Sequence, residues 1–222
     1  DPSVSDMLCA NAELFLDLRR DRGVTETDAE KQVCDPLYAS ALMLQRGDVD
    51  ATVAGAINAT PDVLRPLFQV VGPRPGVSLA SSCFVMITDK EHMGHHGGFI
   101  YADAGVNPNP NPEQLADIAI SSADSCEAYF ETEPRIAMLS FSTKGSAHHP
   151  HVDKVVEATR IAQQKRPDLL IEGELQADAA LAPEVAEMKC VDSRLRGRAN
   201  TLIFPDLDAG NIGYKLTQRL CN

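Results

Sequence analysis

The stretch richest in reactive side chains spans residues 140–146, with the sequence SFSTKGS. It combines hydroxyl groups, the cationic Lys144 and the flexible Gly145, directly after an apolar run that ends at Leu139. Backbone amides together with a nearby cation can hold a phosphate group. A polar turn before a helix has the same composition, so local sequence supports a phosphate site and a simple turn equally.

Two further loops follow apolar runs and contain acidic residues. They span residues 173–178 (GELQAD) and 204–211 (FPDLDAGN). The carboxylates of the first loop would polarise a ligand or cap the next helix, and capping is the expected role. In the second loop, Asp206 lies just past a predicted strand, and Gly210 permits close approach of a backbone or a ligand. The start of a helix explains much of that second pattern.

Two arginines are candidate anion ligands. Arg19 falls in the last turn of one predicted helix, and Arg65 lies within another. Most surface arginines are solvated charges that contribute little. The sharper hypothesis is bidentate capture of a phosphate group.

Histidine and cysteine spacing argues against a metal site. The histidines form two groups, His92, His95 and His96, then His148, His149 and His151. Neither group has a fixed zinc spacing or a paired cysteine. The six cysteines form no C-x-x-C pair, which favours free thiols in a reducing compartment. We therefore expect no metal.

Composition excludes several function classes. The net charge of −12 is unlike that of a nucleic-acid-binding domain, which is usually basic. The apolar runs are too short to cross a membrane. The standard signatures of nucleotide hydrolysis, dinucleotide binding and serine hydrolysis are missing. We expect a cytoplasmic protein with neither a nucleic-acid nor a membrane partner.

Hydrophobic periodicity and capping residues predict the elements that position these loops. The first part of the chain favours helices at about 5–21, 25–36, 37–45 and 60–71, a buried strand at 51–54 and a linker at 72–76. The second part alternates strands and helices. Strands are expected at 77–88, 98–102, 135–139, 169–171 and 201–204, and helices at 113–130, 151–164, 177–188 and 211–220. This alternation predicts a mostly parallel sheet with ligands at its carboxyl edge.

Several motifs, taken in order and spacing, resemble the phosphate acetyltransferase family nearly end to end. Each motif alone is weak evidence for the family, but all of them occur in the order and spacing of the family, which makes the resemblance specific. The motifs are residues 47–51 leading to Gly55, 64–66, 75–79, 119–124, 137–146, 173–180, 204–207, 210–212 and 214–215.

The resemblance implies an α/β fold of two domains with mostly parallel sheets flanked by helices. Such a fold is isocitrate/isopropylmalate dehydrogenase-like, with the active-site cleft between the domains. Residues 1–76 would be part of a first, discontinuous domain, and residues 77–222 would form the second. The implied activity is acetyl transfer between acetyl phosphate and coenzyme A, in a homodimer without a tightly bound cofactor.

Matched residue by residue, the coenzyme A-binding arginines of the family fall on Arg19 and Arg65. Loop position adds four candidates near the acyl-phosphate end, Ser142, Thr143, Lys144 and Gly145. Family members also have an earlier strand-and-helix portion and, beyond Asn222, a segment with the catalytic serine, arginine and aspartate. We therefore expect the 222-residue chain alone to be poorly active or inactive.

Two alternatives accompany this prediction. A phosphate butyryltransferase would share the fold and have a wider acyl pocket. A non-catalytic module that senses acetyl-CoA, like the domain fused to some malic enzymes, would bind the same ligand without turnover. Rates with acetyl and butyryl phosphate separate the two transferases, and a longer reading frame that carries the catalytic segment would argue against the sensing module.

Overall fold

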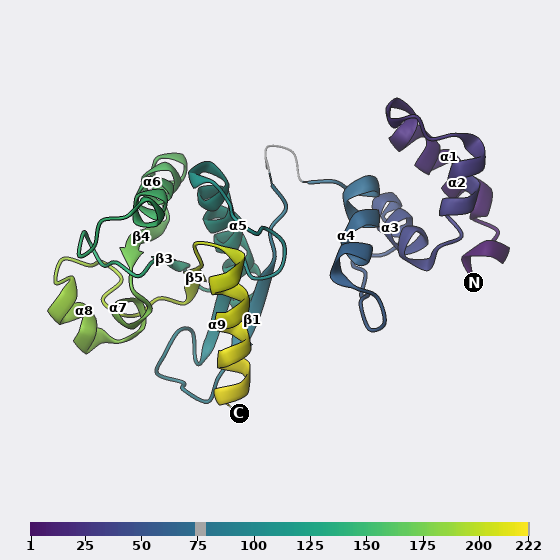
Figure 1. Cartoon of the computed structure of the whole chain (residues 1–222). Helices are drawn as coiled ribbons and strands as arrows, with labels where there is room; N and C mark the ends of the chain where they lie inside the picture. The colour runs from purple at the N-terminus through teal and green to yellow at the C-terminus, as the bar shows by residue number, and fades with distance from the viewer. Residues whose placement is uncertain (74–78, 222) are drawn as a thin grey trace. The chain divides into compact units, whose positions relative to one another are not determined.

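The computed structural model describes residues 1–73 and 79–221. The chain divides into two compact units, Asp1–Gly76 (unit 1) and Val77–Asn222 (unit 2) (Figure 1). The predicted linker at 72–76 and the motif at 75–79 lie partly outside the described residues. None of the described helices has the length and apolar character needed to cross a bilayer.

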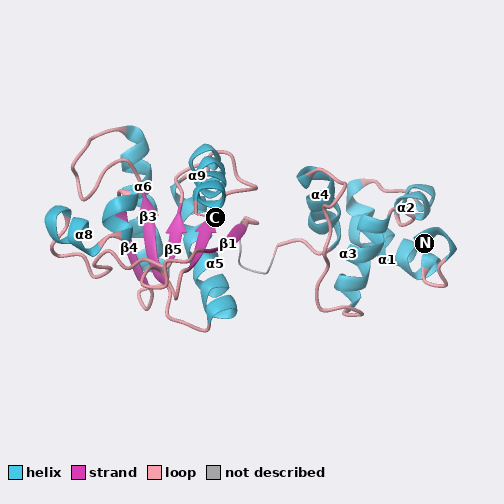
Figure 2. Cartoon of the chain, turned by 90° about the horizontal axis from the view of Figure 1, so that it is seen from below, coloured by secondary structure: helices cyan, strands magenta, loops and turns pink. Residues whose placement is uncertain are grey.

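Within its described residues, the regular secondary structure of unit 1 is entirely helical, and loops connect the helices (Figure 2). A capping box starts its second α-helix as predicted, because Thr25 Oγ1 accepts from Asp28 N at 3.2 Å and Asp28 Oδ2 accepts from Thr25 N at 3.2 Å. Its core includes Phe15 and Tyr38, whose rings pack edge to face at 5.4 Å. The helices are η1 (Pro2–Val4), α1 (Leu8–Arg19), η2 (Arg20–Arg22), α2 (Glu26–Gln32), α3 (Pro36–Arg46) and α4 (Thr60–Val70).

The buried strand predicted at residues 51–54 is wrong. This segment forms neither strand nor helix, and the side chains of Val53 and Ile57 are fully exposed. A strand is stable only when a neighbour satisfies its backbone hydrogen bonds. The described residues of unit 1 contain no strand that could pair with it.

Unit 2 is built on a five-stranded sheet with the order β1-β2-β5-β3-β4. Strand β1 pairs antiparallel with β2, and the other pairings are parallel. This is the mostly parallel sheet flanked by helices that the alternation predicted. The strands are β1 (Cys83–Ile87), β2 (Gly98–Ala102), β3 (Arg135–Leu139), β4 (Leu170–Leu175) and β5 (Thr201–Ile203).

Side chains along β3 alternate between two apolar cores, as the two-residue period of a strand requires. Ile136 and Met138 join the core beneath α5 and α6, whereas Ala137 and Leu139 join the core on the other face. Figure 1 shows α5 and α6 together, with α7, α8 and α9 elsewhere around the sheet. The helices are α5 (Pro112–Phe130), α6 (Pro150–Lys165), α7 (Ala177–Leu181), α8 (Pro183–Lys189) and α9 (Leu207–Leu220).

Several predicted elements of unit 2 have different bounds in the structure, including β4, which extends to Leu175, and α9, which begins at Leu207. The single helix expected at 177–188 is divided into α7 and α8, because Pro183 lacks the amide hydrogen needed inside a helix and instead begins α8. The first strand, expected at 77–88, begins only at Cys83. Residues 77–78 of that prediction lie outside the described residues.

Candidate functional site

The four parallel strands of unit 2 bring their following loops to one edge of the sheet. In such sheets this carboxyl edge is where ligands bind. The loops begin after Ala102, Leu139, Leu175 and Ile203. The three loops selected from the sequence are therefore neighbours, together with a fourth that begins at Asp103.

The loop after β3 is organised around a buried carboxylate from β4. Glu174, whose side chain is almost fully buried, accepts hydrogen bonds from Ser142 Oγ at 2.9 Å and from the Gly145 amide at 2.7 Å. The Lys144 amide donates to the Glu174 carbonyl oxygen at 3.1 Å. The sequence suggested the Ser142 hydroxyl and the Gly145 amide as donors to a phosphate group. In the structure both donate to the Glu174 carboxylate instead.

The other predicted residues of this loop have different surroundings. Thr143 is buried, and its Oγ1 accepts from Gln176 N at 2.9 Å, which ties the loop to the end of β4. Lys144 is exposed, and its Nζ donates to the Gly173 carbonyl at 3.3 Å. Positive φ angles of 47° at Lys144 and 85° at Gly145 turn the loop sharply. Lys144 is therefore the predicted loop residue with a charged group available to a ligand.

The two acids of the segment 173–178, Glu174 at the end of β4 and Asp178 after it, have other roles than the expected N-cap. Helix α7 begins after Gln176 without a side-chain capping hydrogen bond. Asp178 instead pairs with Lys189 at 2.7 Å, and this contact holds the pKa of the Asp178 carboxyl below its usual value. The capping expectation holds for neither acid in its usual form: Glu174 lies within β4 and turns inward, whereas Asp178 accepts from Ala179 N at 2.8 Å in the first turn of α7 but is not its N-cap residue.

The loop after β5 has the helix-start role that its sequence indicated. Asp206 Oδ1 accepts from Ala209 N at 2.9 Å and caps α9. Gly210 contacts backbone rather than solvent, since a Cβ there would overlap the Asp103 carbonyl and lie 3.1 Å from Ala104 Cα. The close approach predicted for Gly210 is therefore to the loop after β2.

Asp103, which the sequence analysis missed, organises that fourth loop. Its buried carboxylate accepts from the amides of Gly105 and Asn107, each at 2.9 Å, and from the Ser82 hydroxyl. The signal that could have found it is the one used for Asp206, an acid directly after a strand. The Asp103 carboxylate fixes the loop backbone against which Gly210 packs.

Lys154 of α6 joins two of the carboxyl-edge loops, and sequence reasoning also missed it. Its Nζ donates to Asn109 Oδ1 at 2.9 Å and to the Pro205 carbonyl at 2.8 Å. Burial lowers the pKa of the Lys154 ammonium, and the negative charge of Asp206 opposes part of that shift. Lys154 therefore holds the loops after β2 and β5 together.

The two predicted arginines lie in unit 1, and both act on Tyr38. Burial raises the pKa of the Tyr38 phenol, and the positive charges of Arg65 and Arg19 offset part of this increase. The buried Arg19 Nε has no hydrogen-bond partner among the described residues. Within residues 1–73 and 79–221, the exposed Arg65 has only a long ion pair with Asp62, at 3.8 Å. Both guanidinium groups thus retain unused donors.

The histidine groups do not form a metal site within the described residues. No set of three or more histidine, cysteine or acidic side chains in residues 1–73 and 79–221 is arranged to hold an ion. His149 instead caps α6, because its Nδ1 accepts from the His151 amide at 3.1 Å.

Known proteins with similar sequences and structures are phosphate acyltransferases. The phosphate acetyltransferase of Thermoanaerobacterium thermosaccharolyticum is 51% identical over 220 residues, which cover 99% of this chain and 67% of that protein. The enzyme of the same name from Acetivibrio thermocellus is 48% identical over 216 residues, 97% of this chain and 65% of that protein. The chain thus spans about two thirds of the length of these relatives.

A solved structure with a similar fold is also a phosphotransacetylase. A phosphotransacetylase from Streptococcus pyogenes superposes with a TM-score of 0.91 at 42% identity, covering 99% of this chain and 65% of that structure. The family described as "Phosphate acetyl/butaryl transferase" matches residues 1–222, so the resemblance extends along the whole sequence. With its motifs, its sheet and its relatives in agreement, the chain belongs to the phosphate acetyl/butaryl transferase family.

Proposed function

We propose that the protein to which this chain belongs transfers an acetyl group between coenzyme A and inorganic phosphate. The observation that carries this proposal is the 51% identity, over 99% of the chain, to a protein named phosphate acetyltransferase. Coenzyme A, acetyl-CoA, acetyl phosphate and inorganic phosphate are then its substrates and products. We further propose that the protein is a homodimer in the cytoplasm. Coenzyme A binds and leaves as a substrate and is not a tightly bound cofactor.

In the reaction we propose, the thiol sulfur of coenzyme A attacks the carbonyl carbon of acetyl phosphate. The new carbon–sulfur bond forms, the bond from the carbonyl carbon to the phosphate oxygen breaks, and phosphate leaves. The thiol proton passes to a base, since a thiol of pKa about 8.5 is mostly protonated at neutral pH. A positioned base typically accelerates such a step by roughly 10²–10⁴-fold.

Two sets of residues in the chain would bind the substrates. We propose that Arg19 and Arg65 bind phosphate groups of coenzyme A, supported by the unpartnered Arg19 Nε and the weakly paired Arg65. We propose that the loop after β3 lies near the acyl phosphate. Lys144 would supply the positive charge, while Ser142, Thr143 and Gly145 would keep the loop in shape through their hydrogen bonds to Glu174 and Gln176.

The test is the rate of acetyl-CoA formation from acetyl phosphate and coenzyme A, measured with the full-length protein. Acetyl transfer that is faster with acetyl than with butyryl phosphate supports the proposal. Binding of acetyl-CoA without any turnover would contradict it and indicate a sensing module. A preference for butyryl phosphate would contradict the assigned acyl group.

A further inference from the structure

Two neighbouring pockets lie at the amino-terminal edge of the sheet in unit 2. One has a volume of about 610 Å³ and the other about 700 Å³. Their lining includes Arg135, the first residue of β3, and residues from the loops that precede β2 and β5. This edge is opposite the carboxyl-edge loops that begin at Asp103, Ser140, Gln176 and Phe204.

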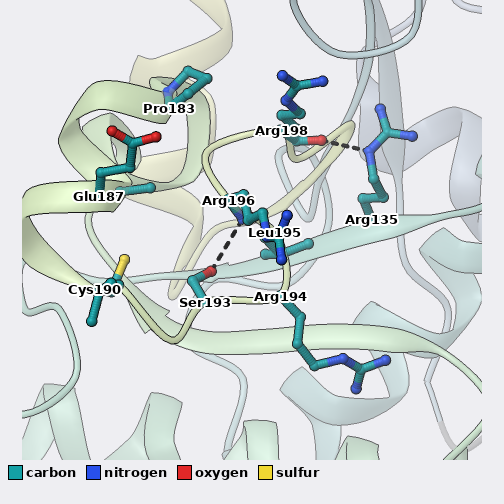
Figure 3. Close-up of a pocket in the computed structure, with 11 residues that line it drawn as sticks. Arg135, Pro183, Glu187, Cys190, Ser193, Arg194, Leu195, Arg196 and Arg198 are labelled. Atoms are coloured by element: carbon teal, nitrogen blue, oxygen red, sulfur yellow. Dashed lines mark hydrogen bonds between the residues drawn. The ribbon is translucent and has the colours of Figure 1, made fainter.

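Arginine side chains are concentrated around these pockets. Arg135 and Arg198 line both, Arg194 and Arg196 also line the first, and His92 lines the second. In Figure 3 the guanidinium groups of Arg135 and Arg198 extend to the same side, whereas that of Arg194 points away from them. This concentration of positive charge stands in a chain whose net charge is −12.

The positive charge is not neutralised by ion pairs. Each pocket also contains a glutamate, Glu187 in the first and Glu184 in the second. Within residues 1–73 and 79–221, no salt bridge joins either glutamate to Arg135, Arg196 or Arg198. In each pocket the arginines therefore outnumber the single glutamate, and their positive charge is available to a ligand.

The surrounding backbone is held in place before any ligand arrives. Arg135 donates from Nε to the Arg198 carbonyl at 2.6 Å and from Nη2 to the Gly94 carbonyl at 2.8 Å (Figure 3 shows the first of these). The buried Glu172 accepts from Ser193 Oγ at 2.5 Å and from the Arg194 amide at 2.8 Å. The loop between Cys190 and Asn200 is thereby tied to β3 and β4. Preorganisation of this kind reduces the entropic cost of binding.

We propose that the first of these pockets, with a volume of about 610 Å³, binds a small molecule that bears a phosphate group, with Arg135, Arg196 and Arg198 as its ligands. Guanidinium groups bind phosphate in a planar, two-point geometry and keep their charge at any physiological pH. Volumes of 300–1,000 Å³ are typical of small-molecule sites, roughly the size of these pockets. The inference is independent of the proposed acetyl transfer, since it uses neither Arg19, Arg65 nor the carboxyl-edge loops.

Inorganic pyrophosphate is the probe, and isothermal titration calorimetry on the full chain is the measurement. Arg198→Gln is the test variant because, within the described residues, the hydrogen bonds of Arg198 are made by its backbone amide and carbonyl, which the substitution keeps. Arg160→Gln, which removes one exposed positive charge from α6, is the matched control. Arg65→Gln tests whether the titrated site is instead the proposed coenzyme A site.

We expect one pyrophosphate site in the unmodified protein, weakened about tenfold or more by Arg198→Gln and unchanged by Arg160→Gln or Arg65→Gln. Equal loss in the Arg160 and Arg198 variants would mean general charge attraction and would overturn the proposal. So would loss in the Arg65 variant alone, or no binding by the unmodified protein. Acetyl-transfer assays do not enter this test, so its failure would leave the proposed function standing.

Discussion

The carboxylate of Glu174 accepts hydrogen bonds from Ser142 Oγ at 2.9 Å and the Gly145 amide at 2.7 Å, which join the end of β4 to the loop after β3. Both Glu174 and Ser142 are buried, so neither partner has water as a substitute. The shape of the candidate acyl-phosphate loop thus depends on one acid in the neighbouring strand.

Replacing that acid should destabilise unit 2. Glu174→Ala leaves the Ser142 hydroxyl and the Gly145 amide without their partner, and we expect a loss of about 1–3 kcal/mol in the free energy of unfolding. Glu174→Gln, which keeps one acceptor oxygen, should lose less. Urea unfolding measures both, with the exposed Glu127→Ala as a control expected within about 0.5 kcal/mol of the unmodified protein. A Glu174→Ala protein as stable as this control would show that the loop does not depend on Glu174.

Gly210 should not tolerate even a methyl group. A Cβ at this position would overlap the Asp103 carbonyl oxygen and lie 3.1 Å from Ala104 Cα, so Gly210→Ala forces α9 away from the loop after β2. We expect about 1–3 kcal/mol of destabilisation, as for other overpacked sites, measured by thermal or urea unfolding. Asp208→Ala changes an exposed residue in the same turn of α9 and is the control. Similar stability of the two variants would contradict the close packing.

Loss of either unit 1 arginine should weaken binding of coenzyme A. Arg19→Gln and Arg65→Gln each remove a guanidinium with unused donors, and we expect the dissociation constant to rise about tenfold. Calorimetry measures this without any need for turnover. Arg20→Gln is a close control, because Arg20 is exposed and already paired with Asp17 at 2.6 Å. An equal effect in all three variants would indicate nonspecific charge attraction instead.

The capping box of α2 should make stability depend on pH in the acid range. Hydrogen bonds from the Thr25 hydroxyl and then the Thr25 amide lower the pKa of Asp28 in the folded chain. Because the folded pKa is below the unfolded one, the stabilisation is fully present above the ordinary value of 3.8 and disappears as pH falls through the lowered folded pKa.

Asp28→Asn tests this dependence. The stability difference between the unmodified protein and this variant should be constant near neutral pH and shrink below about pH 4. Unfolding by urea at several pH values measures it, and Glu30→Gln, an exposed acid in the same helix, is the control. A difference that does not change with pH would rule out the charged form of Asp28 as the stabilising species.

The elements that sequence predicted correctly are those governed by contacts between near neighbours in the chain. The capping box at Thr25 and Asp28 spans four residues, and the helix predicted at 113–130 is α5, where the structure adds a second such box between Asn111 and Gln114. The alternation of apolar runs with amphipathic segments likewise indicated the parallel sheet of unit 2. Such features can be predicted from sequence because the groups that interact lie within one helical turn or one strand.

Tertiary structure decided the contacts between residues far apart in sequence. Glu174 turns inward to Ser142, Gly210 packs against Asp103, and the exposed segment at 51–54 forms no strand. Each outcome depends on a segment that is distant in sequence: whether it supplies a hydrogen-bond donor, a closely packed backbone or a pairing strand. A local sequence pattern does not contain that information.

The grouping of functional side chains has the same origin. The sequence marked Arg19 and Arg65 separately as candidate anion ligands, and packing of α1, α3 and α4 placed both near Tyr38. Arg135 and Arg198 had no signal of their own, since surface arginines are common and only the sheet brings the start of β3 beside the loop before β5. Sequence therefore determined the family and most of the helices and strands. The folded chain determined which charges meet, because electrostatic and hydrogen-bond energies depend on distances in space.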